Sequence, residues 1–209
     1  MHFKDRTDAG RQLAQALIPY QGKEGIIYPL PRGGIVLGVE IAKVLHMPLD
    51  MIIPRKIGHP YNPEYAICAV TEHGEPVCNE QELARADQEW FEQQVKIERL
   101  EARRRRELYL GERKPLDIKD KTAILVDDGI ATGLTMRAAL QDVRQRKPSH
   151  IVIAVPVSPL DTAKQLGKEV DEVVALDIPE FYLGAVGAYY DDFPQVTDSE
   201  VMKLLQSLQ

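Results

Sequence analysis

Two adjacent carboxylates, Asp127 and Asp128, follow a short apolar run and precede a loop of small residues and threonines, residues 129–135. This loop leads into a segment with helical spacing, so its backbone N–H groups would lie at a helix amino terminus, where phosphate binds well. Adjacent carboxylates repel a phosphate, so they must address another part of the same ligand. Because carboxylates accept strong hydrogen bonds from hydroxyl groups, the pattern predicts a site for a ribose 5-phosphate.

A second glycine turn, Arg32-Gly33-Gly34, also lies between a short apolar run and a helical segment. Its glycines allow the backbone to approach an anion closely, and the arginine adds positive charge. Arg55 and Lys56 follow a further apolar run and add two more cations. Each feature alone is common, and an ordinary glycine turn would explain the first. Taken alone, neither the glycine turn nor the Arg55-Lys56 dipeptide indicates a ligand site.

The elements that must position these residues alternate regularly along the chain. Apolar runs typical of strands occupy residues 25–30, 49–53, 122–126, 150–156 and 170–176. Helical spacing occurs between them, in residues 7–20, 35–45, 134–146 and 160–168. This alternation predicts an α/β fold with a mostly parallel sheet flanked by helices. Ligands bind at the carboxyl ends of strands in such sheets, which is where both glycine loops fall.

Two segments depart from the alternation, and the whole chain, 1–209, is expected to be one domain that carries both. Residues 58–114 read as an insertion, with a hairpin formed by 66–71 and 76–78 and a long charged helix over 80–110. Residues 177–209 are rich in aromatic side chains and end in a helix capped near Thr197 or Asp198.

Residues 124–135, ILVDDGIATGLT, resemble the motif that binds phosphoribosyl pyrophosphate (PRPP) in type I phosphoribosyltransferases. The similarity is closest to a bacterial group that shares the PRGG turn at 31–34 and this loop. It implies that Asp127 and Asp128 contact the 2- and 3-hydroxyls of the ribose. The residues implied to hold the 5-phosphate are Ala131, Thr132, Gly133, Leu134 and Thr135. Those implied to bind pyrophosphate are Arg32, Gly33, Gly34, Arg55 and Lys56. An Asp127-Asp128 pair that only caps a turn would not need the strand, loop and helix to occur in this order.

The resemblance implies transfer of a phosphoribosyl group from PRPP to a nitrogenous base, with Mg²⁺ held mainly by PRPP itself. Asp127, Asp128 and Lys56 are then catalytic, and Glu64 could act as an acid or base from the insertion, although it could equally be only solvated. Ala131 replaces the aspartate of 6-oxopurine enzymes and matches adenine enzymes, so a purine-like acceptor is expected. The aromatic side chains expected to stack on the acceptor, or else to pack the last helix, are Phe181, Tyr182, Tyr189 and Tyr190.

Other functions fit parts of the sequence. A PRPP- or nucleotide-sensing regulator would need a basic face for nucleic acid, which a net charge of -6 does not favour. The arginine run at 103–106 lies among glutamates and reads as a solvated helix face. A non-catalytic subunit would have lost motif residues, whereas both carboxylates and Gly129 are present here. The resemblance also implies that residues 177–209 form a small carboxyl-terminal hood and that the protein is a homodimer.

The composition, 44% hydrophobic and 28% charged, is ordinary for a globular protein. The sequence has neither an apolar run of the roughly 20 residues that a membrane span needs nor a signal-like start, so a cytoplasmic location is expected. Cys68 and Cys78 are too few for a disulfide framework or a zinc cluster. They could face each other across the predicted hairpin, but reduced thiols are expected.

Overall fold

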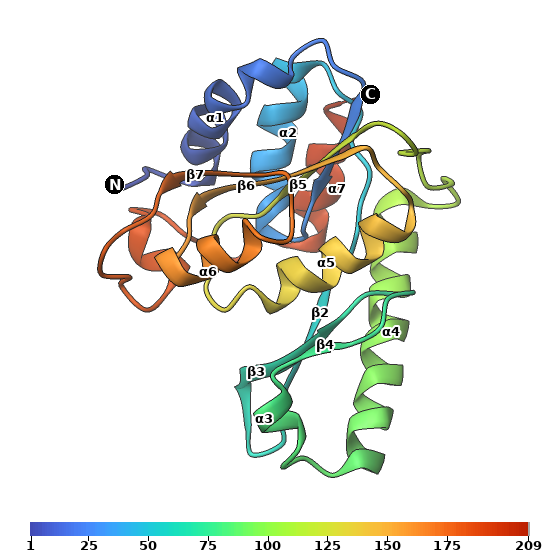
Figure 1. The fold of residues 1–209 in the computed structure, drawn as a ribbon. Coiled ribbons are helices and arrows are strands. Elements are labelled where there is room, and N and C mark those ends of the chain that lie inside the picture. The colour runs from blue at the N-terminus through green and yellow to red at the C-terminus, as the bar shows by residue number, and fades with distance from the viewer. Residues whose placement is uncertain (209) are drawn as a thin grey trace.

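The computed structural model describes residues 1–208 and contains a central sheet of four parallel strands in the order β1-β5-β6-β7. The strands are β1 (Gly25–Pro29), β5 (Thr122–Val126), β6 (His150–Val157) and β7 (Glu172–Asp177). Two helices cover each face of the sheet: α1 (Arg6–Ala16) and α2 (Gly33–Leu45) on one, α5 (Leu134–Gln145) and α6 (Leu160–Leu166) on the other (Figure 1). The predicted α/β fold with a mostly parallel sheet is therefore confirmed.

Alternate residues of each strand pack against opposite helix layers, as the pleat of a strand requires. Ile27 of β1 is in register with Ile124 of β5, and both are fully buried in the cluster formed with α1 and α2. Tyr28 and Leu125, the next pair along, are buried in the cluster formed with α5. Burial on both faces explains why β1 and β5 read as continuous apolar runs.

The strand expected over 49–53 is wrong, because this segment makes only an isolated bridge from Leu49 to Ile27. Pro48 and Pro54 bracket it and supply no N–H group for a ladder. The Asp50 carboxylate also accepts hydrogen bonds from the backbone N–H groups of Met51 and Leu116, at 2.8 Å each. The segment instead delivers the chain, in extended form, to the strand that begins at Arg55.

The insertion forms a separate antiparallel sheet and a helical arm. Its strands are β2 (Arg55–His59), β3 (Asn62–Val70) and β4 (Val77–Cys78), and its helices are α3 (Glu80–Leu83) and α4 (Gln88–Leu110). The single helix expected over 80–110 is thus divided, because Asp87 caps α4 by accepting from the Trp90 N–H at 2.8 Å. Figure 1 shows β2, β3, β4 and α4 projecting together from the α/β layers.

The two cysteines occupy paired positions on β3 and β4 and form a disulfide, Cys68–Cys78. The expectation that they face each other across the hairpin is correct, and the expectation of reduced thiols is wrong. Cys68 is fully buried beside Ile57 and Val95, in a small core that belongs to the insertion.

The chain ends flank the sheet. The first helix is capped by Asp5, and it is followed by the 3-10 turn η1 (Ile18–Tyr20). After β7 come the 3-10 turn η2 (Val186–Tyr189) and α7 (Asp198–Gln206), which Thr197 caps as predicted. In Figure 1, α7 lies beside α2. Within residues 1–208, every helix is too short or too polar to cross a membrane.

Candidate functional site

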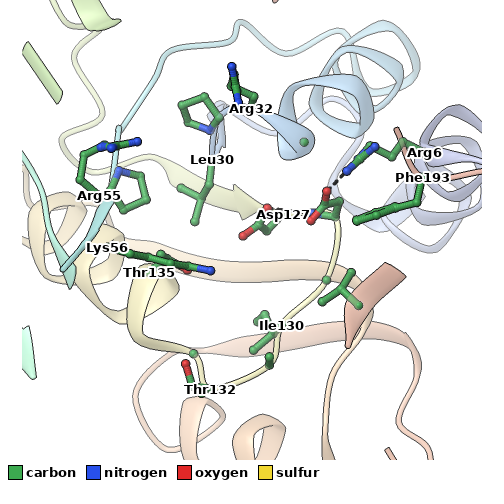
Figure 2. Close-up of a pocket in the computed structure, with 18 residues that line it drawn as sticks. Arg6, Leu30, Arg32, Arg55, Lys56, Asp127, Ile130, Thr132, Thr135 and Phe193 are labelled. Atoms are coloured by element: carbon green, nitrogen blue, oxygen red, sulfur yellow. Dashed lines mark hydrogen bonds and ion pairs between the residues drawn. The ribbon is translucent and has the colours of Figure 1, made fainter. Parts of the chain in front are cut away.

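A cavity of about 430 Å³ lies where the carboxyl ends of β1 and β5 meet the start of β2 (Figure 2). Four parts of the chain line it: the turn after β1, the first residues of β2, the loop after β5 and the hood, with α1 contributing one side chain. The polar side chains around it are carboxylates, hydroxyls and cations, namely Arg6, Arg32, Arg55, Lys56, Asp127, Asp128, Thr132 and Thr135. The topology thus brings the two predicted glycine loops together.

The loop after β5 is anchored from outside, so that its backbone is available to the cavity. The Ile130 N–H donates to the Val157 carbonyl at 2.9 Å, and the Thr162 hydroxyl donates to the Ala131 carbonyl at 3.0 Å. Gly133 precedes α5 with a φ of 79°, a conformation that favours glycine. The first N–H groups of a helix have no partner within it, so α5 can present them to an anion.

The carboxylates Asp127 and Asp128 sit at the base of this loop, partly buried and side by side. The Asp128 backbone N–H donates to Oδ1 of Asp127 at 2.9 Å. Burial raises the pKa of Asp127 well above its ordinary 3.8, and the neighbouring charge of Asp128 raises it further. Burial also raises the pKa of Asp128, against the opposing effect of the Arg6 guanidinium. A ligand that offers hydroxyl donors or a cation would relieve this unfavourable pair.

The turn after β1 approaches the carboxylates closely. Its Pro31–Arg32 peptide bond is cis, which is rare when the second residue is not proline. Gly33 lines the cavity, and a Cβ atom on it would meet Oδ2 of Asp128. Gly34 packs behind it, since a Cβ atom there would lie 2.7 Å from the Val126 carbonyl oxygen. Arg32 is held toward the carboxyl-terminal helix, with Nη1 3.7 Å from Oδ1 of Asp198.

The two cations of β2 differ in their surroundings. Arg55 Nε donates to Oε2 of Glu98 on α4 at 2.7 Å, so much of its charge is used within the insertion. Lys56 is exposed, and Figure 2 shows it extending into the cavity. Its charge opposes the rise in the pKa of Asp127 and of Asp128. Lys56 is therefore the better placed of the two to meet a bound anion.

Several expected residues lie elsewhere. Glu64 is exposed on β3, while Leu134 and Gly34 are buried or nearly so beside the loops, and none of the three lines the cavity. The four aromatic residues expected to stack on the acceptor, or else to pack the last helix, are not among those that line this cavity. Tyr189 and Tyr190 belong to the core beneath α1, Tyr182 stacks on Tyr189 at 5.5 Å between ring centroids, and Phe181 is 85% exposed.

The hood reaches the cavity through Val186 and Phe193 instead, and α1 reaches it through Arg6. Val186 packs on the loop so closely that a Cβ atom on Gly129 would lie 2.5 Å from its Cγ1. The sequence held one signal for Arg6: Gly10 and Leu13, four and seven positions later, are buried on the same helix face. A charged residue in phase with a buried stripe needs a partner.

Comparison with known proteins gives one family. The profile of the family described as "Phosphoribosyl transferase domain" matches residues 3–192. Two curated Mycobacterium tuberculosis proteins, named "Putative phosphoribosyl transferase MT0597" and "Putative phosphoribosyl transferase Rv0571c", are each 39% identical over 205 residues. The match covers 97% of this chain and 46% of each relative, so the chain spans about half the length of the curated relatives it matches.

Two solved structures share the fold. The crystal structure of TT1426 from Thermus thermophilus has 43% sequence identity and a TM-score of 0.80, with 99% of both chains covered. The AQ2163 protein from Aquifex aeolicus has 12% identity and a TM-score of 0.51, with 83% of this chain and 74% of that chain covered. The second is a likeness of fold alone.

Proposed function

This chain belongs to the phosphoribosyl transferase family, and we propose that it transfers the 5-phosphoribosyl group of PRPP to a nitrogenous base, with release of pyrophosphate. The observation that carries this proposal is the placement of Asp127 and Asp128 between the start of α5 and the Arg32–Gly33 turn, around one cavity. A phosphate, a diol and a pyrophosphate must be bound side by side to hold PRPP. The cavity offers one group of partners for each.

Each part of PRPP has assigned partners in this proposal. The 5-phosphate takes the N–H groups of residues 131–135 and the hydroxyls of Thr132 and Thr135, at the start of α5. The ribose hydroxyls donate to Asp127 and Asp128. The pyrophosphate lies toward the Arg32–Gly33 turn and Lys56. The raised pKa values of both carboxyl groups support the diol assignment, because hydroxyl donors stabilise the charged forms that burial disfavours.

The reaction breaks the bond between the anomeric carbon and a pyrophosphate oxygen and forms a bond from that carbon to a ring nitrogen, which loses its proton. The transition state should resemble an oxocarbenium ion, as in glycoside chemistry. Lys56 and Arg32 stabilise the charge that develops on the leaving group. Mg²⁺ fits a cavity of carboxylate and hydroxyl oxygens and, when bound with PRPP, would supply further neutralisation of the pyrophosphate. Glu64, exposed on β3, would need the insertion to move before it could exchange a proton with the base.

The acceptor proposed is a flat, purine-like base. Ile130, Val186 and Phe193 give one end of the cavity an apolar lining suited to a ring system. Ala131 also leaves that position of the loop without a carboxylate, as in the adenine enzymes that the loop resembles. The same proposal includes a cytoplasmic location, which rests on the polar character of the sequence, and a homodimer, which rests on the family resemblance alone.

The test is calorimetric titration of the purified protein with PRPP and Mg²⁺, followed by assay of pyrophosphate release with a panel of purine and pyrimidine bases. Magnesium-dependent binding and turnover with one base are expected. The Asp127→Asn/Asp128→Asn variant should lose PRPP affinity by more than roughly 10-fold while remaining folded. Glu89→Gln/Glu92→Gln, on the exposed side of α4, changes the net charge equally and should bind normally. No binding by the wild-type protein would refute the proposal, and binding without turnover on any base would refute the transfer step.

A further inference from the structure

Arg6, the first residue of α1, is a buried cation that meets three groups at the edge of the cavity. Only 9% of the residue is exposed. Its Nε donates to Oδ2 of Asp128 at 2.7 Å, its Nη1 donates to the Pro194 carbonyl at 2.6 Å, and its guanidinium lies 3.6 Å from the centroid of the Phe193 ring. Figure 2 shows the Arg6 side chain next to Phe193 and close to Asp127.

These contacts use features that belong to arginine alone. The planar guanidinium donates in two directions at fixed angles while its face stacks on an aromatic ring. Removing the positive charge would leave Asp128 buried without its nearest opposite charge, which is a costly arrangement. Arg11, further along α1, is by contrast an exposed cation that pairs with Glu40 at the surface.

The backbone at Gly33 also confines Asp128, on the side where Arg6 binds its Oδ2 atom. A Cβ atom on Gly33 would lie 1.9 Å from Oδ2 of Asp128 and 3.0 Å from Nε of Arg6, so the backbone of α2 closes this side. The Asp128 backbone is also fixed, because the Tyr190 hydroxyl donates to its carbonyl at 2.6 Å. With Oδ2 held by Arg6, the other carboxylate oxygen is the one we expect to accept from a ligand hydroxyl.

We propose that Arg6 is a positioning residue, which orients the Asp128 carboxylate for the ribose diol and ties that orientation to the hood through Phe193 and Pro194. This inference rests on the proposed function, since it assumes a ribose ligand at Asp128. It adds a residue from the start of the chain, outside both glycine loops, to the binding machinery. Arg6 acts through Asp128 and not by contact with the reacting atoms.

A purely structural role makes a different prediction. If Arg6 only joined α1 to residues 193–194, its loss would weaken every ligand of the cavity by a similar factor. If Arg6 orients Asp128, its loss should act through one hydroxyl. The contribution of that hydroxyl can be measured by comparing ribose 5-phosphate with its 2-deoxy and 3-deoxy analogues, in the wild type and in each variant.

The experiment measures the affinities of PRPP and of these three sugar phosphates for the wild type, Arg6→Ala, Arg6→Lys, Asp128→Asn and the double variant Arg6→Ala/Asp128→Asn. Arg6→Ala should weaken PRPP and ribose 5-phosphate by about 10- to 100-fold, the range that corresponds to one lost hydrogen bond to a charged group. Asp128→Asn should abolish the preference for ribose 5-phosphate over one of its two deoxy analogues. Arg6→Ala should lose most of the preference over that same analogue. The double variant should bind little worse than Asp128→Asn, because two residues that act through one contact are not additive.

Arg6→Lys keeps the charge without the planar fork, and we expect it to recover part of the preference. Arg11→Ala is the matched control on the same helix and should leave all affinities unchanged. Equal weakening of all three sugar phosphates by Arg6→Ala, or by Arg6→Lys if the alanine variant does not fold, would overturn the positioning role. Failure of the wild type to bind PRPP would instead overturn the proposed function, so the two failures are distinguishable.

Discussion

Gly33 of α2 and Asp128 of the loop after β5 lie so close that a Cβ atom on Gly33 would be 1.9 Å from the Asp128 Oδ2 atom. Their backbones come from two different glycine loops, so this approach joins the turn after β1 to the carboxylate pair. The glycine is required here by space, because it has no Cβ atom to displace the carboxylate.

Gly33→Ala should therefore act first on ligand binding. The added methyl group would push the Asp128 side chain from its place beside Arg6, at a stability cost of about 1–3 kcal/mol, as in other overpacked sites. We expect PRPP affinity to fall by more than roughly 10-fold, comparable to the loss of a charged hydrogen bond. Titration calorimetry and thermal unfolding measure both effects.

The control is Gly167→Ala at the end of α6, where a Cβ atom would meet the Ala163 carbonyl oxygen only at 3.3 Å. This variant should bind PRPP like the wild type. If Gly33→Ala also bound PRPP like the wild type, the Asp128 carboxylate would not need its observed position.

The buried Asp127 carboxyl destabilises the folded protein by an amount that depends on pH. Its pKa in the folded protein is raised by burial and by Asp128, so folding disfavours its ionised form. The stability from its protonated form is fully present below pH 3.8 and is lost as the pH rises through the raised folded-state pKa. At neutral pH, the free energy of unfolding of Asp127→Asn should therefore exceed that of the wild type by roughly 0.5–2 kcal/mol, the usual gain from a single stabilising substitution.

The difference between Asp127→Asn and the wild type should shrink as the pH falls toward 4, where the wild-type carboxyl is protonated as well. Urea unfolding at a series of pH values would measure it. Asp142→Asn is the opposite case, because Asp142 is paired with Arg146 Nη2 at 2.9 Å, and this variant should be less stable at neutral pH. If Asp127→Asn were less stable than the wild type at every pH, burial of the ionised Asp127 carboxylate would not be destabilising.

The sequence predicted the two glycine loops because each is a local feature. In each, an apolar strand, a turn of small residues and a helix start follow one another within about a dozen residues, and the parallel order of the sheet brings their ends together. Gly33 and Asp128 could thus be assigned to one site before any contact between them was known. The division of the charged helix at Asp87 was also readable in principle, since aspartate is a strong amino-terminal cap.

What the sequence did not predict depends on contacts between distant residues. Arg6 and Asp128 are separated by 122 positions, and no motif contains both. The aromatic residues of the hood could equally stack on a ligand or fill a core, and composition does not distinguish these outcomes. In the folded chain, Tyr189 and Tyr190 are buried in the core under α1, whereas Phe193 lines the cavity.

Lys56 and Arg55 are neighbours with different expected roles. Lys56 extends into the cavity, whereas Arg55 is paired with Glu98. Lys56→Gln should lower PRPP affinity and reduce the salt dependence of binding by about one ion equivalent, because one fewer cation then meets the ligand's phosphates.

Arg55→Gln is the matched control. It removes the ion pair to Glu98, which at this partly exposed position is worth about 0–1 kcal/mol, and it should alter the salt dependence of PRPP binding less than Lys56→Gln does. Calorimetry at several salt concentrations measures the slopes. If PRPP affinity depended on salt concentration equally for Lys56→Gln and the wild type, Lys56 would not contact the pyrophosphate.

Tyr189 and Tyr190 offer a test of how firmly the hood holds the aspartate pair. Both are buried in one core, but the Tyr190 hydroxyl donates to the Asp128 carbonyl at 2.6 Å, while the Tyr189 hydroxyl accepts from the Leu183 N–H at 2.9 Å. Each Tyr→Phe change removes one part-buried hydrogen bond to the backbone, so each should cost about 0.5–1.5 kcal/mol of stability. Only Tyr190→Phe frees the Asp128 backbone, so only it should weaken PRPP binding beyond what the loss of stability explains. Unfolding and PRPP titration of the two variants, side by side, measure this. If both weakened PRPP equally, or if neither did, the Tyr190 hydroxyl would be a core contact with no part in holding Asp128.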